Sequence, residues 1–231
     1  VSVSPLYYNS SGKLKIEFIH SFTDDLDDES YGIDKFRVTV HGPCITPSPT
    51  ATPTGSPTEV PTPSPSECYE DMEVSYEEFE ENDGTWTYGN VSTFGSDDEV
   101  GEFLGRYGNG TEYPSKTFDI PKDADYVTID FWFLEIDSWE DADDVNMMVD
   151  DTVLDLGNFN QNDTGENDVY ENTDVPGLTL KRVKYDDSSN VAFSDALDQV
   201  HVVSVSISPL YYNSSGKVTI EFIHSFTDDL D

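Results

Sequence analysis

Residues Val127–Leu134 read VTIDFWFL, and every odd-numbered position in this stretch is apolar. Trp132 and Leu134 add apolar side chains at even positions towards its end. Successive side chains of a β-strand point to opposite faces of a sheet, so an alternating pattern indicates one buried face. The pattern therefore predicts a central strand whose second face also becomes buried towards its end.

Shorter stretches with the same period lie on both sides of this strand. Gly, Asp, Asn and Pro separate them, and no segment longer than a turn has a helical period. Many short strands between such turns are typical of sandwiches and jelly rolls. The predicted strands are 14–18, 36–40, 74–79, 117–120, 178–185, 199–206 and 218–222, with a hairpin over 146–156. We predict an all-β fold of jelly-roll-like β-sandwich repeats joined by a Pro/Ser/Thr-rich linker.

The chain contains an internal repeat. Residues 1–27 (VSVSPLYYNSSGKLKIEFIHSFTDDLD) return at 205–231 at a constant offset of 204 residues. The copies differ only at Val3/Ile207, Leu14/Val218 and Lys15/Thr219. Repetition at a fixed period indicates a tandem architecture. The repeat predicts that the chain is slightly more than one period of a longer polymer, beginning and ending within the same structural element.

The repeat also predicts how the chain is divided. We expect residues 1–42 to be the closing strands of a preceding sandwich repeat, 43–68 a linker, and 69–231 a sandwich that lacks its last strand. The first copy continues through Asp28–Val40, and the second copy has no counterpart of these residues in the chain. Because residues 1–27 would compete with 205–231 for one place, we expect the first copy not to supply the missing strand.

The missing strand would then come from the next repeat or from a neighbouring chain. Strand addition of this kind is head-to-tail and does not close, so it builds filaments. The partners are copies of the same protein. The apolar residues expected at this joint are Leu14, Ile16, Phe18, Phe36, Val38 and Val40.

The linker is rich in proline. Eight prolines fall within Pro43–Glu67, mostly as Thr-Pro or Ser-Pro. Such a tract tends to an extended polyproline II conformation and suits a spacer that carries O-glycans on Ser and Thr or on hydroxylated proline. The candidate positions are Thr46, Ser48, Thr52, Ser56, Thr62, Ser64, Pro47, Pro49, Pro53, Pro57, Pro63 and Pro65.

Three features favour an extracellular or cell-surface location. The composition is acidic and poor in Lys. Five Asn-x-Ser/Thr sequons are candidate N-glycosylation sites: Asn9, Asn90, Asn109, Asn162 and Asn213. The only two cysteines, Cys44 and Cys68, stand at the ends of the linker. In an oxidising compartment they can pair and fold the linker back on itself, or join neighbouring domains.

The charge of the chain limits its partners. It has 48 Asp and Glu residues against 11 Lys and Arg, a formal net charge of -37. A surface this acidic repels nucleic acids and anionic lipids, and no 18-residue apolar run predicts a membrane span. It favours hard divalent cations such as Ca²⁺, whose preferred ligands are carboxylate oxygens. A solvated acidic face that keeps the protein soluble is the alternative.

Three motifs together carry a resemblance. They are Phe103–Gly108 (FLGRYG), Asp130–Trp139 (DFWFLEIDSW) and Asp28–Asp34 (DESYGID), the last followed by Val38. The set resembles a β-sandwich module of secreted proteins from marine bacteria and microalgae, with the pattern FLGRFG, FDFxxIDSWD and DESWGIDNVRV. The resemblance implies a jelly-roll-like module that often occurs in repeats on surface or matrix proteins. The sequence departs from the family's Asp-Asn at Asp34-Lys35.

Candidate calcium ligands come from dense acidic loops and from the resemblance. Like charges on short loops repel each other unless a cation lies among them. The loops supply Asp137, Asp141, Asp143, Asp144, Asp28 and Glu29. The resemblance implies Ca²⁺ where the first and last strands meet, which adds Glu80 and Asp34. The chain has no EF-hand spacing and no Gly-Gly-x-Gly-x-Asp repeat.

No pattern of catalytic residues is present. The sequence has no Ser-His-Asp order, phosphate-binding loop or His-rich metal set, and acids this numerous supply a glycosidase-like pair by chance. We expect no enzyme. We predict the subunit of a glycan-coated, Ca²⁺-stabilised extracellular filament. The alternative is a Ca²⁺-dependent carbohydrate-binding or adhesive module of a large surface protein, with a sugar-stacking platform formed by Trp86, Tyr88, Tyr107, Trp132 and Trp139.

Overall fold

The computed structural model describes a set of segments that together form two sheets. At 16–17, at several strand ends and throughout 217–225, only the backbone is described. The described residues are 16–17, 29–42, 71–80, 85–93, 101–107, 114–121, 124–137, 139, 144–149, 152–159, 169–186, 198–211 and 217–225.

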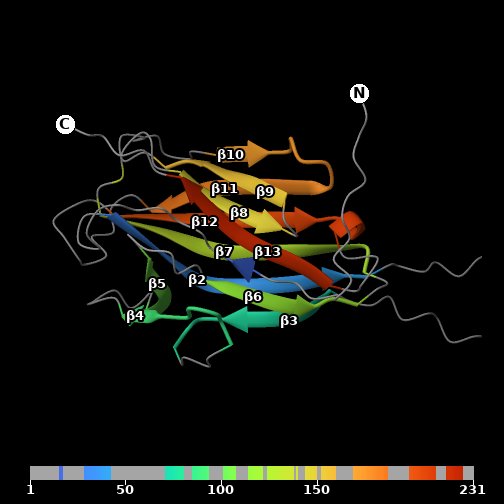
Figure 1. Ribbon diagram of the computed structural model, residues 1–231, viewed down its shortest axis with the longest axis horizontal. Coiled ribbons are helices and arrows are strands. Elements are labelled where there is room, and N and C mark those ends of the chain that lie inside the picture. The colour runs from blue at the N-terminus through green and yellow to red at the C-terminus, as the bar shows by residue number, and fades with distance from the viewer. Residues whose placement is uncertain are drawn as a thin grey trace, which may run out of the picture.

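The larger sheet has eight antiparallel strands. It is paired in the order β10-β11-β12-β7-β2-β5-β4, and β3 pairs with the same edge of β2 as β5 does (Figure 1). The strands are β2 (Glu29–His41), β3 (Met72–Glu77), β4 (Val91–Thr93), β5 (Glu102–Tyr107), β7 (Tyr126–Asp137), β10 (Val169–Asn172), β11 (Leu178–Asp186) and β12 (Gln199–Ile207).

In the smaller sheet, β6, β13, β8 and β9 are neighbours in that order, and β1 also pairs with β6. Its strands are β1 (Ile16–Glu17), β6 (Ser115–Asp119), β8 (Asp144–Val149), β9 (Thr152–Asn158) and β13 (Lys217–Ser225). A short 3-10 helix, Pro209–Tyr211, joins β12 to β13. No helix in the described part of the chain is long and apolar enough to cross a membrane.

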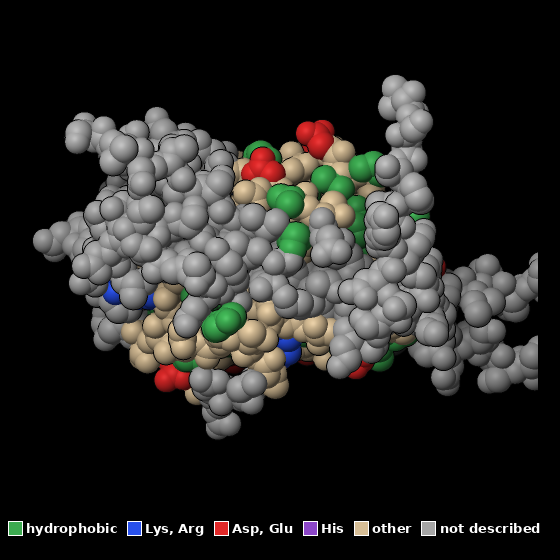
Figure 2. Space-filling model, viewed as in Figure 1, with side chains coloured by type: hydrophobic (Ala, Val, Ile, Leu, Met, Phe, Trp, Pro, Cys, Tyr) green, Lys and Arg blue, Asp and Glu red, His purple; other side chains and the backbone are tan. Residues whose placement is uncertain are grey.

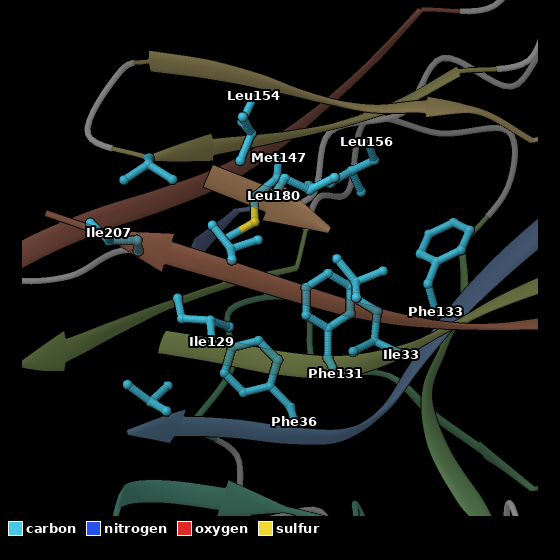
Figure 3. Close-up of a cluster of buried hydrophobic side chains, with 14 of the residues drawn as sticks. Ile33, Phe36, Ile129, Phe131, Phe133, Met147, Leu154, Leu156, Leu180 and Ile207 are labelled. Carbon is cyan, nitrogen blue, oxygen red and sulfur yellow. The ribbon is translucent and has the colours of Figure 1, made fainter. Parts of the chain in front are cut away.

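One apolar core lies between the two sheets. Met147, Leu154 and Leu156 of the smaller sheet face Phe131 and Leu180 of the larger sheet (Figure 3). All five side chains are almost fully buried. Facing layers of alternating side chains define a sandwich. The all-β prediction is therefore confirmed.

The central strand is also confirmed. β7 lies between β12 and β2. Its odd-numbered residues from Val127 to Phe133 are buried in the main core. On the other face, Leu134 and Ile136 are buried against Phe103 and Val200. Both faces of β7 are thus covered towards its end, as VTIDFWFL indicates.

Two boundaries differ from the sequence-based expectation. The strand predicted over 36–40 begins earlier, because β2 starts at Glu29 and pairs with the end of β7 at Asp137. Between the predicted hairpin over 146–156 and the predicted strand over 178–185, the structure has a further strand, β10, which pairs with β11. In both places tertiary pairing overrides a weak local β signal, which is a common outcome for polar strands.

The place predicted to lack a strand is occupied in this structure. The chain's own Glu29–His41 forms β2, in the middle of the larger sheet. This corrects the expectation that the first copy could not supply the strand. The competition that we expected arises because 1–27 and 205–231 share one sequence. Residues 29–41 have no second copy in the sequence, so no repeat copy competes with them for the place of β2. In an assembly, the same place in the sheet can be filled by β2 of a neighbouring chain.

Candidate strand-docking site

β2 is held on both of its edges. Along one edge it pairs with β7 from Glu29↔Asp137 to His41↔Tyr126. Its other edge is shared between β5, which pairs with Tyr31–Ile33, and β3, which pairs with Phe36–Val40. Strand pairing on both edges satisfies most of the backbone hydrogen bonds of a strand. We call the place that β2 occupies between β7 and the β5/β3 pair the strand-docking site.

The three motifs of the resemblance meet at this site. Residues 103–107 of FLGRYG lie on β5, 29–34 of DESYGID on β2 and 130–137 of DFWFLEIDSW on β7, so these parts of the motifs form three neighbouring strands. Gly32 and Gly105 face each other, and a Cβ on Gly105 would come within 2.9 Å of the Gly32 Cα. Gly105 also has a φ of 151°. Only glycine permits this close approach in that conformation.

Ser30, at the start of β2, is fully buried and bound from two sides. The Trp139 indole Nε1 donates to the Ser30 carbonyl at 3.1 Å. The Arg106 Nε donates to the Ser30 hydroxyl at 3.1 Å. Arg106 and Trp139, which belong to the two other motifs, therefore hold the start of β2 in place. Both residues belong to the motifs, but these two contacts join segments that are distant in the chain, so no local pattern in the sequence predicts them.

Phe36 anchors the second half of β2 in the core. Its ring is fully buried and packs edge-on against Trp86 at a centroid distance of 5.3 Å. It also stacks with Phe118 of the smaller sheet at 5.8 Å and with Phe131 of β7 at 6.0 Å. Aromatic contacts of this kind add to the free energy of apolar burial. Val38 and Val40 are buried as well, so all three β2 residues predicted for the assembly joint lie within the core.

Asp34 lies where β5 and β3 separate. The register between β2 and β7 shifts between Asp34 and Arg37, and Lys35 has a φ of 48°. The Lys35 backbone NH donates to Asp34 Oδ1 at 2.7 Å. Asp34 is 2% exposed. We call this gap the Asp34 fork.

The Asp34 fork is electrostatically unusual. Burial raises the pKa of Asp34 from 3.8 to about 7. The Lys35 backbone NH and ammonium group act in the opposite direction, and the carboxylates of Glu78 and Glu80 add to the increase in pKa. A carboxyl group taken out of water beside other carboxylates keeps its proton more tightly. Asp34 therefore keeps its proton up to near-neutral pH.

The structure brings together some of the predicted calcium ligands. Asp34 and Glu80 lie close enough for Glu80 to raise the pKa of Asp34. Glu29 and Asp137 are cross-strand partners, although their side chains lie outside the described part. Asp144 begins β8, again with only its backbone described. Asp28, Asp141 and Asp143 lie outside the described residues. Among the described residues, no group of three His, Cys, Asp or Glu side chains has the arrangement of a metal site.

Most of the aromatic residues proposed for sugar stacking are internal. Trp86, Tyr107 and Trp139 are at most 6% exposed, so they belong to the core. Trp132 is half-buried and packs against the exposed Tyr185 at 4.9 Å. The Lys35 Nζ lies 3.3 Å above the Trp132 ring, a cation–π contact. The five residues therefore do not form a common exposed platform.

A buried hydrogen bond between His201 and Glu135 lies inside the sandwich. The His201 Nε2 is 3.0 Å from the Glu135 Oε2, and both side chains are almost fully buried. These residues are on neighbouring strands β12 and β7. Buried polar side chains need such partners to offset the loss of water. No local pattern in the sequence predicts this contact, since pairing between distant strands leaves no local signal.

The predicted modification sites are mostly outside the described residues. Asn90 is described and exposed, directly before β4. The other four sequon asparagines, both cysteines and all the linker positions predicted for O-glycans lie outside the described part, as do Leu14 and Phe18. Figure 2 shows few basic side chains on the face in view, in keeping with the composition.

Comparisons with family models, curated proteins and solved structures found no match to this chain. The resemblance to a secreted β-sandwich module therefore stays a prediction.

Proposed function

We propose that this protein is a structural subunit of an extracellular filament, in which each sandwich is completed by a strand from a neighbouring copy. The donated strand is the equivalent of β2, and the site that receives it is the strand-docking site. The proposal has no catalytic step. Glycans on the sequons and on the linker would coat the assembled fibre.

One observation carries the proposal: β2 and β3 are antiparallel neighbours, yet 30 residues connect them. A hairpin between such strands needs only about 2–5 residues. The 25 residues of Pro43–Glu67, extended at about 3.1 Å per residue, span about 80 Å. A connection of this length is unnecessary within one sandwich, but it is long enough to carry β2 to another one.

The strand-docking site is specific enough to recognise a donated strand. At one end it binds Ser30 through two side-chain hydrogen bonds. At the other end it packs Phe36 among three aromatic rings. Backbone pairing provides affinity in strand addition, and pockets for alternate side chains provide specificity. Donation from one molecule to the next is heterologous and does not close, so its product is a linear polymer.

Electron microscopy of the purified protein tests this assignment. We expect fibres with a regular axial repeat. The chain with Phe36→Asp is expected to form no fibres, because burying a charged carboxylate among the aromatic rings that surround Phe36 has a large desolvation cost. Val153→Asp, the same kind of change at an exposed position of β9, is the control and should leave fibres intact. Uniform monomers of the unmodified chain at millimolar Ca²⁺ would contradict the proposal.

The cysteines offer a covalent test of strand donation. β2 and β3 pair at Thr39↔Glu73 and Val40↔Met72. If the same register continues for four more residues, it puts Cys44 opposite Cys68. Opposite residues in an antiparallel pair have Cα atoms about 4.5–5.5 Å apart, within the range that a disulfide requires. We therefore expect these two thiols to form a disulfide, with oxidised glutathione accepting their two electrons.

The disulfide reports which molecule supplies β2. Donation between molecules links Cys44 of one chain to Cys68 of the next, so fibres should give a ladder on a non-reducing denaturing gel. A chain that uses its own β2 gives a single band, which shifts on reduction. Cys44→Ser is the control and should abolish both products. Thiols that stay fully open to alkylation in the folded, oxidised protein would contradict the register.

A further inference from the structure

The C-terminal copy of the repeat closes the smaller sheet. β13 pairs with β6 through Lys217–Ile220 and with β8 through Ile220–Ser225. Within this register, Ile220 lies opposite Lys116 of β6. We call the place between β6 and β8 the closing slot.

The N-terminal copy pairs with the same strand in the same register. Ile16 of β1 lies opposite Lys116, and Glu17 lies opposite Ser115. Ile16 is the repeat equivalent of Ile220, since the offset between the copies is 204 residues. β6 therefore pairs with the shared sequence of the repeat, in one alignment, whichever copy presents it.

The two copies also lie on the same side of β6. β1 contacts β13 and β8 in addition to β6, and in Figure 1 it is the short, unlabelled dark blue arrow beside β13. Strands in a sheet are about 4.8 Å apart, so a strand beyond β6 would be about 14 Å from β8. On the opposite edge of β6, Ser115 exchanges both of its backbone hydrogen bonds with Thr87, at 2.9 and 3.1 Å. Both copies thus approach the closing slot, which has room for one strand.

The strands that line the closing slot are fixed by contacts of their own. The Lys116 ammonium binds the Glu77 carboxylate of the larger sheet, and both side chains are largely buried. Phe118 stacks with Phe36 in the core. On β8, Val145, Met147 and Val149 are fully buried. A slot whose walls are already ordered requires little additional ordering when a strand enters.

We propose that the closing slot is an exchange site, in which the N-terminal copy of a second molecule replaces the molecule's own β13. This inference rests on the filament proposal and extends it. The donor segment then supplies two strands to its neighbour, one from 14–22 in the smaller sheet and β2 in the larger. The displaced C-terminal copy leaves the sheet. The partner is a second copy of this chain.

The few differences between the copies set the direction of exchange. Two of the three differences fall within the paired segment, where Val218 and Thr219 replace Leu14 and Lys15. β-branched residues favour strands over Leu and Lys. The molecule's own β13 is therefore the better strand, so exchange starts from a closed state. Converting Val218→Leu and Thr219→Lys should speed exchange by removing this advantage.

Disulfide trapping between two molecules tests the exchange. The acceptor carries Thr117→Cys, because Thr117 pairs with Thr219. The donor carries Lys15→Cys, the repeat equivalent of position 219. Both full-length chains also carry Cys44→Ser and Cys68→Ser, and oxidised glutathione is the oxidant. We expect an interchain disulfide, with a several-fold higher yield when the acceptor also carries Val218→Leu and Thr219→Lys.

A donor with Leu14→Cys is the matched control. A shift of one residue turns the thiol to the opposite face of the strand, so it should give little product. Equal trapping by both donors, or none by Lys15→Cys, would overturn the exchange. The filament proposal is tested separately by the Cys44–Cys68 ladder. A ladder without trapping would reject the exchange alone, and the absence of both would reject both proposals.

Discussion

A chain that begins at residue 43, and therefore lacks β2, is expected to stay unfolded until a peptide of residues 29–42 is added. The peptide carries five almost fully buried side chains: Tyr31, Ile33, Phe36, Val38 and Val40. At about 2 kcal/mol for each large apolar side chain, their burial contributes on the order of 10 kcal/mol. This amount is similar to the whole stability of an ordinary domain, about 5–15 kcal/mol.

The measurement is circular dichroism and thermal unfolding with increasing peptide. We expect a cooperative transition to appear only with the peptide. A matched peptide with Phe36→Ala should bind at least a hundredfold more weakly, since loss of a buried Phe costs about 3–5 kcal/mol. If the shortened chain aggregates, co-expression with each peptide gives the same comparison through soluble yield. Cooperative folding of residues 43–231 without peptide would contradict the assignment of β2 as a donated strand.

Replacing Asp34 with Asn should stabilise the protein at neutral and alkaline pH. The pKa of Asp34 is 3.8 in the unfolded chain and about 7 in the folded state. Between these values the native state binds the extra proton, so stability falls as the pH rises through this window. At about 1.4 kcal/mol for each tenfold change in proton affinity, the penalty reaches about 4 kcal/mol above pH 7. The amide oxygen of the substituted side chain can still accept from the Lys35 NH.

Urea unfolding from pH 4 to pH 8 in a chelator measures this effect. The gain of Asp34→Asn over the unmodified chain should be small at pH 4 and reach its maximum above pH 7. Asp125→Asn, at an exposed position, removes the same charge and serves as the control. Parallel pH profiles for the two variants would show that Asp34 is not the group responsible.

The calcium predicted from the sequence would act on the same carboxyl group. A cation bound at the Asp34 fork holds Asp34 ionised and stabilises the folded state by mass action. Adding Ca²⁺ at pH 8 should then raise the melting temperature of the unmodified chain and leave that of Asp34→Asn unchanged. Equal melting temperatures of the unmodified chain with Ca²⁺ and with chelator would show that Ca²⁺ does not bind at the Asp34 fork.

The sequence predicted the strands whose burial pattern is local. β7 was recognisable because its apolar residues alternate and then extend to both faces. The hairpin β8–β9 and the strands β11 and β12 have the same kind of signal. β10 was missed because its residues, VYEN, alternate weakly, and its pairing with β11 decides its state. The repeat was also visible in full, since identity between copies needs no structure to detect.

The candidate site depended on the tertiary structure. The three motifs could be recognised separately, but only strand pairing shows that β5, β2 and β7 are neighbours and that Trp139 and Arg106 bind Ser30. Composition indicates many acids and cannot show that Asp34 is the one buried at the fork. Desolvation depends on what covers a carboxyl group, and that cover comes from segments distant in the chain.

The amino-acid sequence by itself determined the all-β class, the central strand and the duplication, because alternation and identity are properties of the chain alone. Only the tertiary structure decided where the duplicated segments go. It puts β2 inside the larger sheet and brings both copies of the repeat to Lys116 in one register. The physical reason is that strand pairing is non-local: a sequence shows which residues prefer a sheet, and the free edges of the folded sheet determine which segment occupies each place.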